Sequence, residues 1–133
     1  MSTLDGPSYK GSCHCGRITF ECDSTLERVS ICNCAMCAKQ GFMHWLVPRA
    51  SFRLLTPLAN VATYTFTTAR AKHHFCGVCG IAPFTMPRAH PGSVDVNVRC
   101  LEGVDFATVS IDYADSRLLQ AAHTGVGRRA LNA

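Results

Sequence analysis

The chain has 133 residues, a length typical of one folded domain that can bury a hydrophobic core. Hydrophobic residues make up 47% and charged residues 17% of the sequence, which excludes an intrinsically disordered polypeptide. The formal net charge is +4, and no block of five or more Lys or Arg residues accompanies it, so the sequence gives little reason to expect a nucleic-acid partner.

The local pattern along the chain predicts mostly short β-strands, because apolar and polar residues alternate and β-branched residues are frequent. The predicted strands are residues 17–22, 42–47, 51–55, 61–67, 72–75, 94–100 and 107–113. Residues 115–123 form the expected helix, with Asp115 or Ser116 as its N-cap. We therefore expect a single mostly-β domain over residues 1–133, with short antiparallel sheets and a short C-terminal helix.

Two further expectations concern membrane association and cellular location. The sequence contains no run of about 18 apolar residues, so it predicts no membrane span. Its first residues, MSTLDGPSYK, lack the apolar core of a signal peptide, so we expect a cytoplasmic protein. The cytoplasm keeps thiols reduced, which favours metal binding over disulfides.

The nine cysteines are the most informative residues. Seven of them fall into three closely spaced groups, and close thiols bind soft metal ions such as zinc. These groups are C-x-C at Cys13 and Cys15, C-x-C-x-x-C at Cys32, Cys34 and Cys37, and C-x-x-C at Cys76 and Cys79. Four thiolates make a closed structural zinc site, whereas three leave one position open for chemistry. Seven bound thiolates and two zinc ions would also reduce the formal charge from +4 to about +1.

The two-sulfur motifs are each followed by a glycine, Gly16 and Gly80, which we interpret as relieving crowding where backbone NH groups point at thiolates. The simplest assembly joins these two half-sites into one four-cysteine site and leaves the triplet with a second zinc. In a competing arrangement, Cys22 or Cys100 would be the fourth ligand of the triplet. Both lie on alternating apolar faces, where a free cysteine packs as a small hydrophobic residue.

The motifs GSCHCG (11–16), CNCAMC (32–37) and FCGVCG (75–80), in this order, resemble the glutathione-dependent formaldehyde-activating enzyme family, which also contains centromere protein V. The resemblance covers residues 9–113. The stretches HWLVPRASFRLL (44–55), TYTFTT (63–68) and PRAHPG (87–92) are similar to centromere protein V in particular.

The resemblance implies an Mss4-like, zinc-stapled all-β fold and two zinc ions per chain. It implies a structural zinc on Cys13, Cys15, Cys76 and Cys79, and a catalytic zinc on Cys32, Cys34 and Cys37. The implied activity is that of a carbon–sulfur lyase resembling S-(hydroxymethyl)glutathione synthase, which condenses glutathione with formaldehyde. A three-thiolate zinc suits this reaction, because it can hold the glutathione sulfur as the attacking thiolate.

Several polar residues are weaker candidates for contacts with the substrate. A site for glutathione, or for another small thiol and a small aldehyde, should present basic side chains to carboxylates. The candidates are Lys39, Arg49 and Arg88, together with Asn33 as a hydrogen-bond donor inside the triplet. His14, His44, His73 and His74 are expected to be packed or surface residues. The alternative function is a non-enzymatic zinc-binding interaction module resembling centromere protein V, and the sequence leaves the oligomeric state open.

Overall fold

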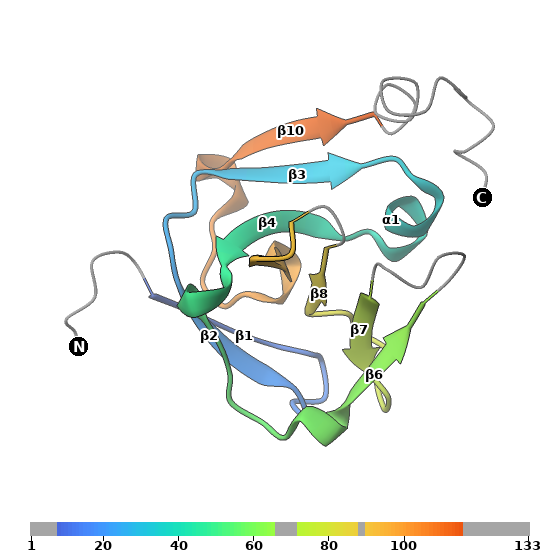
Figure 1. Ribbon diagram of the computed structural model, residues 1–133. Helices are drawn as coiled ribbons and strands as arrows, with labels where there is room; N and C mark the ends of the chain where they lie inside the picture. The colour runs from blue at the N-terminus through green and yellow to red at the C-terminus, as the bar shows by residue number, and fades with distance from the viewer. Residues whose placement is uncertain (1–7, 66–71, 88–89, 116–133) are drawn as a thin grey trace.

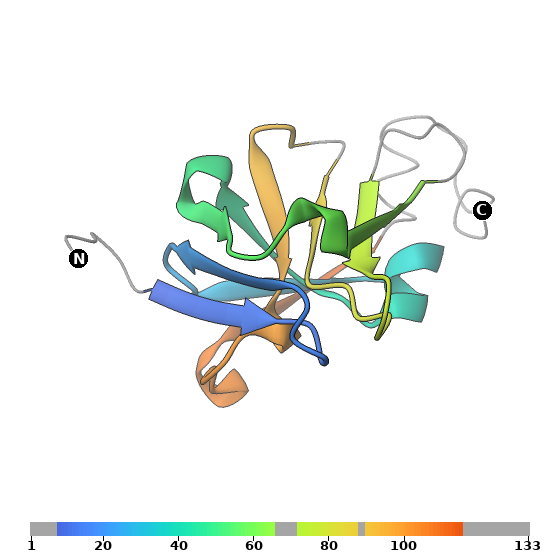
Figure 2. The same cartoon turned by 90° about the horizontal axis from the view of Figure 1, so that it is seen from below.

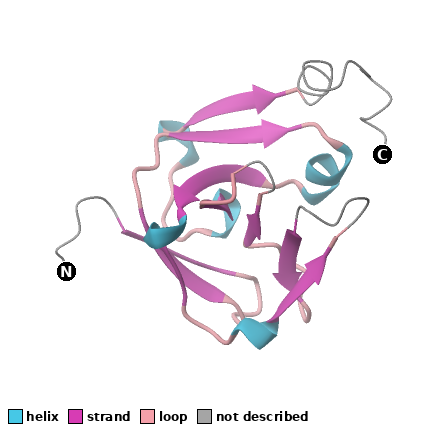
Figure 3. Cartoon of the chain, viewed as in Figure 1, coloured by secondary structure: helices cyan, strands magenta, loops and turns pink. Residues whose placement is uncertain are grey.

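The computed structural model describes residues 8–65, 72–87 and 90–115, and these form two β-sheets with one short α-helix and several 3-10 turns (Figures 1 and 3). The strands are β1 (Ser8–Ser12), β2 (Thr19–Asp23), β3 (Arg28–Cys32), β4 (Met43–Pro48), β5 (Phe52–Leu54), β6 (Val61–Tyr64), β7 (Lys72–Cys76), β8 (Phe84–Met86), β9 (Ser93–Asn97) and β10 (Ser110–Ala114). Helix α1 is Ala35–Gln40, and the 3-10 turns are Arg49–Ser51, Leu58–Asn60, Val98–Cys100 and Phe106–Thr108. The predicted mostly-β fold is therefore confirmed.

One sheet has three strands in the order β1-β2-β5, and the other has seven in the order β10-β3-β4-β9-β8-β7-β6. All strand pairs are antiparallel except β10 with β3, which run parallel. The expected short antiparallel sheets are therefore found, with this one parallel pair as the exception. A long connection separates these strands in the sequence, so a hairpin does not dictate their direction.

The hydrophobic core lies between the two sheets (Figure 2). Ile18, just before β2, and Phe20 and Cys22 on β2 are fully buried, as their alternation predicts. Three rings join the sheets, with Phe52 stacked on Phe20 at 5.3 Å and tilted against Phe84 at 4.9 Å. This continuous aromatic packing fixes how the small sheet sits on the large one.

The backbone of Gly11 on β1 packs tightly against the Phe20 ring. A Cβ atom at this position would lie 2.3 Å from the Phe20 ring, so only glycine allows this approach. The Trp45 ring packs edge-on against Tyr9 at 5.5 Å, and its Nε1 donates to the Thr25 carbonyl at 3.2 Å. These contacts hold β1 over β4 and leave the other face of the large sheet uncovered by the small one.

The structure differs from the sequence prediction at several elements. Strands β1, β3 and β8 and helix α1 were not predicted, and the predicted strand 94–100 ends at Asn97, where a 3-10 turn begins. The first part of the predicted strand 107–113 lies in the 3-10 turn Phe106–Thr108. The predicted helix 115–123 lies outside the described residues beyond Asp115, as does the end of the predicted strand 61–67.

Candidate metal centres and the adjoining cavity

The first and third cysteine motifs come together although they lie far apart in the sequence. The ligand atoms of Cys13, Cys15, Cys76 and Cys79 all lie within 4.8 Å of one another. The Cys15 Sγ is 3.8 Å from Cys13 Sγ and 3.6 Å from Cys76 Sγ. Four sulfur atoms at such spacing can surround one tetrahedral metal ion.

Backbone NH groups point at the sulfur atoms of this four-cysteine cluster. Ile18 N donates to Cys13 Sγ at 3.3 Å, and Val78 N and Cys79 N donate to Cys76 Sγ at 3.3 and 3.4 Å. A hydrogen bond from the Cys79 backbone is the largest effect that lowers the pKa of Cys76. Such donors stabilise thiolates, which are the form that binds metal.

The glycine that follows each half-site has a different role from the one expected. Gly16 and Gly80 have φ angles of 86° and 81°, and a Cβ atom at either position would meet nothing within 4 Å. The interpretation as relief from crowding is therefore wrong. The left-handed backbone conformation, which residues with a Cβ rarely adopt, is what requires glycine there.

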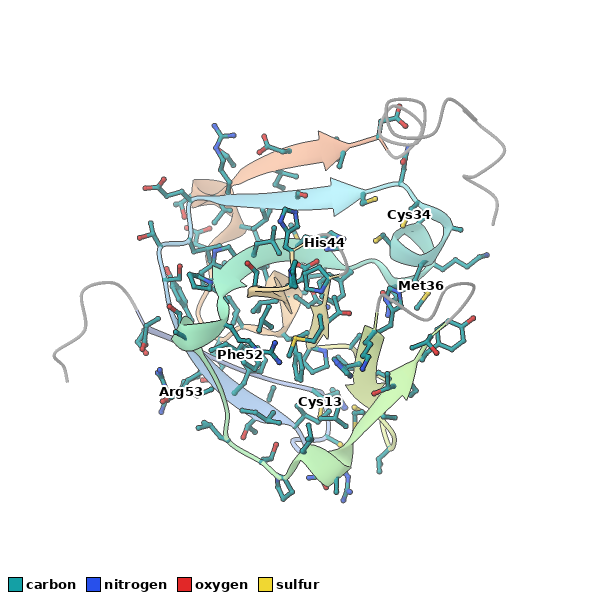
Figure 4. All side chains as sticks on the ribbon, viewed as in Figure 1. Cys13, Cys34, Met36, His44, Phe52 and Arg53 are labelled. Carbon is teal, nitrogen blue, oxygen red and sulfur yellow. The ribbon has the colours of Figure 1, made fainter. Side chains whose placement is uncertain are left out.

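The cysteine triplet forms a second, separate group where β3 passes into α1. Cys32 ends β3, Cys34 is the N-cap of α1 and Cys37 lies in its first turn, so all three ligand atoms lie within 4.8 Å of one another. Cys34 N donates to Cys32 Sγ at 3.4 Å, and Cys37 N donates to Cys34 Sγ at 3.3 Å. In Figure 4 the labelled Cys34 lies beside α1, well away from the labelled Cys13 of the four-cysteine cluster.

The three thiols of the triplet do not share negative charge equally. A hydrogen bond with the Cys37 thiol lowers the pKa of Cys34 to about 5, and the same contact raises the pKa of Cys37. Burial is the main cause that raises the pKa of Cys32. One thiolate is thus favoured at neutral pH, and the other two sulfur atoms need a cation before they lose their protons.

The two remaining cysteines lie outside both sulfur groups within the part of the chain that the structure describes. Cys22 is fully buried in the core, and burial raises its pKa to about 12. Burial also raises the pKa of Cys100 to about 11, and the groups that act on it electrostatically are Cys13 and Cys79 of the other cluster. Both therefore pack as apolar residues, and neither supplies the triplet with a fourth ligand.

A cavity of about 660 Å³ adjoins the triplet on the polar face of the seven-stranded sheet. Its wall includes Cys32 and Cys37, so two of the three sulfur-bearing residues face it. The register of the sheet explains its polarity. Directly paired residues share a face, and one row pairs Ser30, His44 and Asn97 while the neighbouring row pairs His73, Thr85, Asp95 and Leu46.

The cavity also contains a buried hydrogen-bonded pair that no sequence pattern predicts. His44 Nδ1 lies 2.6 Å from Asp95 Oδ2, with only 17% and 9% of the two side chains exposed. Apolar and polar residues alternate along β9, and both faces of this central strand are buried, Asp95 included. No spacing in the sequence could signal the pair, because 51 positions separate the two residues.

The substrate candidates chosen from the sequence lie in different places. Asn33 is exposed and its Nδ2 donates to Asp115 Oδ1 at 3.2 Å, while Lys39 is exposed in the last turn of α1. Arg49 is exposed in a 3-10 turn, and Arg88 lies outside the described residues. Arg28 was not among these candidates. It is a basic residue that lines the cavity, and its guanidinium lies 3.0 Å from the Asp112 carboxylate.

Two comparisons relate the chain to known proteins. The model of the glutathione-dependent formaldehyde-activating enzyme family matches residues 8–113. The chain is also similar to the crystal structure of a Rhodobacter sphaeroides protein, with 30% sequence identity and a TM-score of 0.72. That similarity covers 79% of this chain and 99% of the other. Because the family match spans the strands, both sulfur groups and the cavity, the chain belongs to the glutathione-dependent formaldehyde-activating enzyme family.

Proposed function

We propose that the protein is a zinc-dependent carbon–sulfur lyase that forms or cleaves a thiol–aldehyde adduct, in the manner of S-(hydroxymethyl)glutathione synthase. The thiol is glutathione or another small thiol, and the aldehyde is formaldehyde or another small aldehyde. The observation that carries this proposal is the cysteine triplet beside a cavity, since a three-sulfur group has no fourth ligand among the described residues. Membership of a formaldehyde-activating family supports the same reaction class.

The donor atoms suit zinc. All-sulfur tetrahedral sets favour zinc over hard divalent ions such as Mg²⁺ and Ca²⁺, and both groups are compact enough for a single ion. In this proposal Cys13, Cys15, Cys76 and Cys79 hold a structural ion, and Cys32, Cys34 and Cys37 hold a catalytic ion. Such an ion supplies thiol activation, because it favours the thiolate over the thiol. A cytoplasmic location would keep all seven ligand thiols reduced.

The residues of the chain provide the binding space. A cavity of about 660 Å³ lies within the range usual for small-molecule sites. Leu46, which shares its face of β4 with His44, adds an apolar part to the cavity wall, which limits the access of water to a reactive aldehyde. Arg28 offers a cation to one of the two glutathione carboxylates. The thiol end of the ligand then lies toward Cys32 and Cys37.

The exchange of glutathione and formaldehyde with their hydroxymethyl adduct tests this function. We expect zinc-loaded protein to accelerate the exchange above its spontaneous rate, and Cys34→Ser to remove the acceleration while leaving the fold and the other metal in place. Cys100→Ala removes a cysteine outside both sulfur groups and serves as the matched control. Absence of acceleration by wild-type protein that holds two zinc ions would show that the named reaction is wrong.

A further inference from the structure

Two buried polar atoms in the cavity lack a hydrogen-bond partner within the part of the chain that the structure describes. His44 Nδ1 and Asp95 Oδ2 satisfy each other at 2.6 Å, but His44 Nε2 and Asp95 Oδ1 have no partner among the described residues. Buried polar atoms without partners are rare in proteins, because their desolvation is not repaid. Since both residues line the cavity beside the triplet, these atoms indicate a polar ligand there.

The sheet fixes both side chains in place. His44 pairs with Asn97 across β4 and β9, and Asp95, two residues before Asn97 on β9, lies on the same face of the sheet. The Phe42 ring packs against the imidazole with centroids 4.7 Å apart. A carboxylate that accepts from Nδ1–H leaves Nε2 as the free basic nitrogen of the ring. Figure 4 labels His44 on β4, in the same part of the molecule as Cys34.

Building on the function proposed above, we propose that His44 is a catalytic residue that carries the proton between the thiol sulfur and the aldehyde oxygen, and that Asp95 is the positioning residue that holds its ring. The motivating geometry is a buried histidine with one nitrogen fixed by a carboxylate and the other unpartnered, in a cavity shared with Cys32 and Cys37.

The step balances without another reactant. His44 Nε2 takes the proton of the thiol S–H bond, and the sulfur attacks the carbonyl carbon. The S–C bond forms as the π pair of the C=O bond moves onto oxygen, and the imidazolium returns its proton to that oxygen. The product is the hydroxymethyl thioether, and the reverse sequence releases thiol and aldehyde.

Other ionisable groups surround His44. Asp95 faces it from β9, and Cys32 and Cys37 share the cavity from β3 and α1. His73 on β7 interacts electrostatically with Asp95 and His44. Burial lowers the pKa of His73, so its imidazole is neutral at pH 8.

The decisive variant is His44→Asn, because the asparagine amide can still donate to Asp95 but cannot accept and return a proton. We expect the accelerated exchange to fall about 100-fold, the usual scale of general acid–base catalysis, with glutathione affinity changed less than about threefold. His74→Asn is the matched control, since His74 lies on the opposite face of β7 and packs against Phe84. The control should keep turnover within about twofold of wild type.

Calorimetry of glutathione binding to the zinc-loaded protein, in buffers of different ionisation enthalpy, provides a readout apart from activity. At pH 8, wild type should release almost no proton to the buffer, because His44 retains it, whereas His44→Asn should release about one. Equal proton release by the two proteins overturns the proposal even if the protein acts on a different aldehyde. If glutathione neither binds nor reacts, the proposed function and this inference fall together.

A competing role for His44 is that of fourth metal ligand. If so, the visible absorption of cobalt bound to the triplet would change in the His44→Asn variant, and the metal affinity of the triplet would fall by more than about tenfold. Either result overturns the proposal that His44 transfers a proton.

For Asp95→Asn, we expect a lower kcat with KM nearly unchanged, together with loss of the downfield proton resonance of the imidazole Nδ1–H. The proposal would also be overturned if His44→Asn protein that folds like wild type kept its acceleration of the exchange within about threefold of the wild-type value.

Discussion

The Sγ atoms of Cys15 and Cys76 lie 3.6 Å apart, although the two residues are 61 positions apart in the sequence. The contact ties the turn that follows β1 to the end of β7, so it joins the small sheet to the large one. A metal ion at this place would close a long loop and would bind only the folded chain. Its binding free energy would therefore contribute to the stability of the fold.

We expect Cys76→Ser to lose one equivalent of metal and most of its cooperative unfolding transition. Cys76 is fully buried and accepts two backbone hydrogen bonds, so its loss opens both the metal cluster and the core. Metal analysis and thermal unfolding measure the two effects. A variant that unfolds like wild type and keeps its full metal content would contradict the structural role.

The triplet should lose its metal before the four-cysteine cluster does. A three-ligand site holds its ion by fewer bonds, and its sulfur atoms border a cavity rather than the core. Stepwise addition of a chelator should release one ion per chain while the folded structure persists, and the second ion should leave only on unfolding. A single cooperative release of both ions would argue that both sites are structural.

Metal binding by the triplet should strengthen as the pH rises. Cys34, with a pKa of about 5, is already a thiolate at pH 7, whereas the raised pKa values of Cys32 and Cys37 keep these two protonated. Each ion bound near pH 7 must then displace about two protons, so affinity should rise about 100-fold per pH unit. Competition with a metal-sensitive dye between pH 6 and pH 8 measures this slope, and a pH-independent affinity would be inconsistent with it.

Arg28 lines the cavity in the structure, whereas Arg49 is a substrate candidate predicted from the sequence, so the two can be compared directly. Arg28 lines the cavity, so Arg28→Ala should weaken glutathione binding about fivefold, a modest loss because the side chain is 69% exposed and already paired with Asp112. Arg49→Ala should change binding less than about twofold. Calorimetric titration distinguishes them, and the opposite order would restore the prediction made from the sequence.

Sequence reasoning succeeded where the relevant geometry is local. Cysteines two or three positions apart can reach one ion from a single turn, so their spacing identifies three chelating motifs, and these motifs in their order carry the resemblance to the family. Strand β2 was recognised because its alternation matches the two-residue period of a half-buried strand. The sequence pattern does not predict helix α1, because the helix has only six residues and a cysteine at its N-cap in place of the usual Ser, Thr, Asp or Asn.

The sequence by itself determined the sulfur chemistry, the mostly-β class and the family, since each depends on residue types and short spacings. The tertiary structure alone decided which face of the large sheet carries the cavity, that β10 runs parallel to β3, and that His44 meets Asp95. These features depend on strand order and register between segments distant in the chain. A shift of one residue in the pairing of β4 with β9 would turn one of those two side chains to the opposite face, and no local pattern fixes that register.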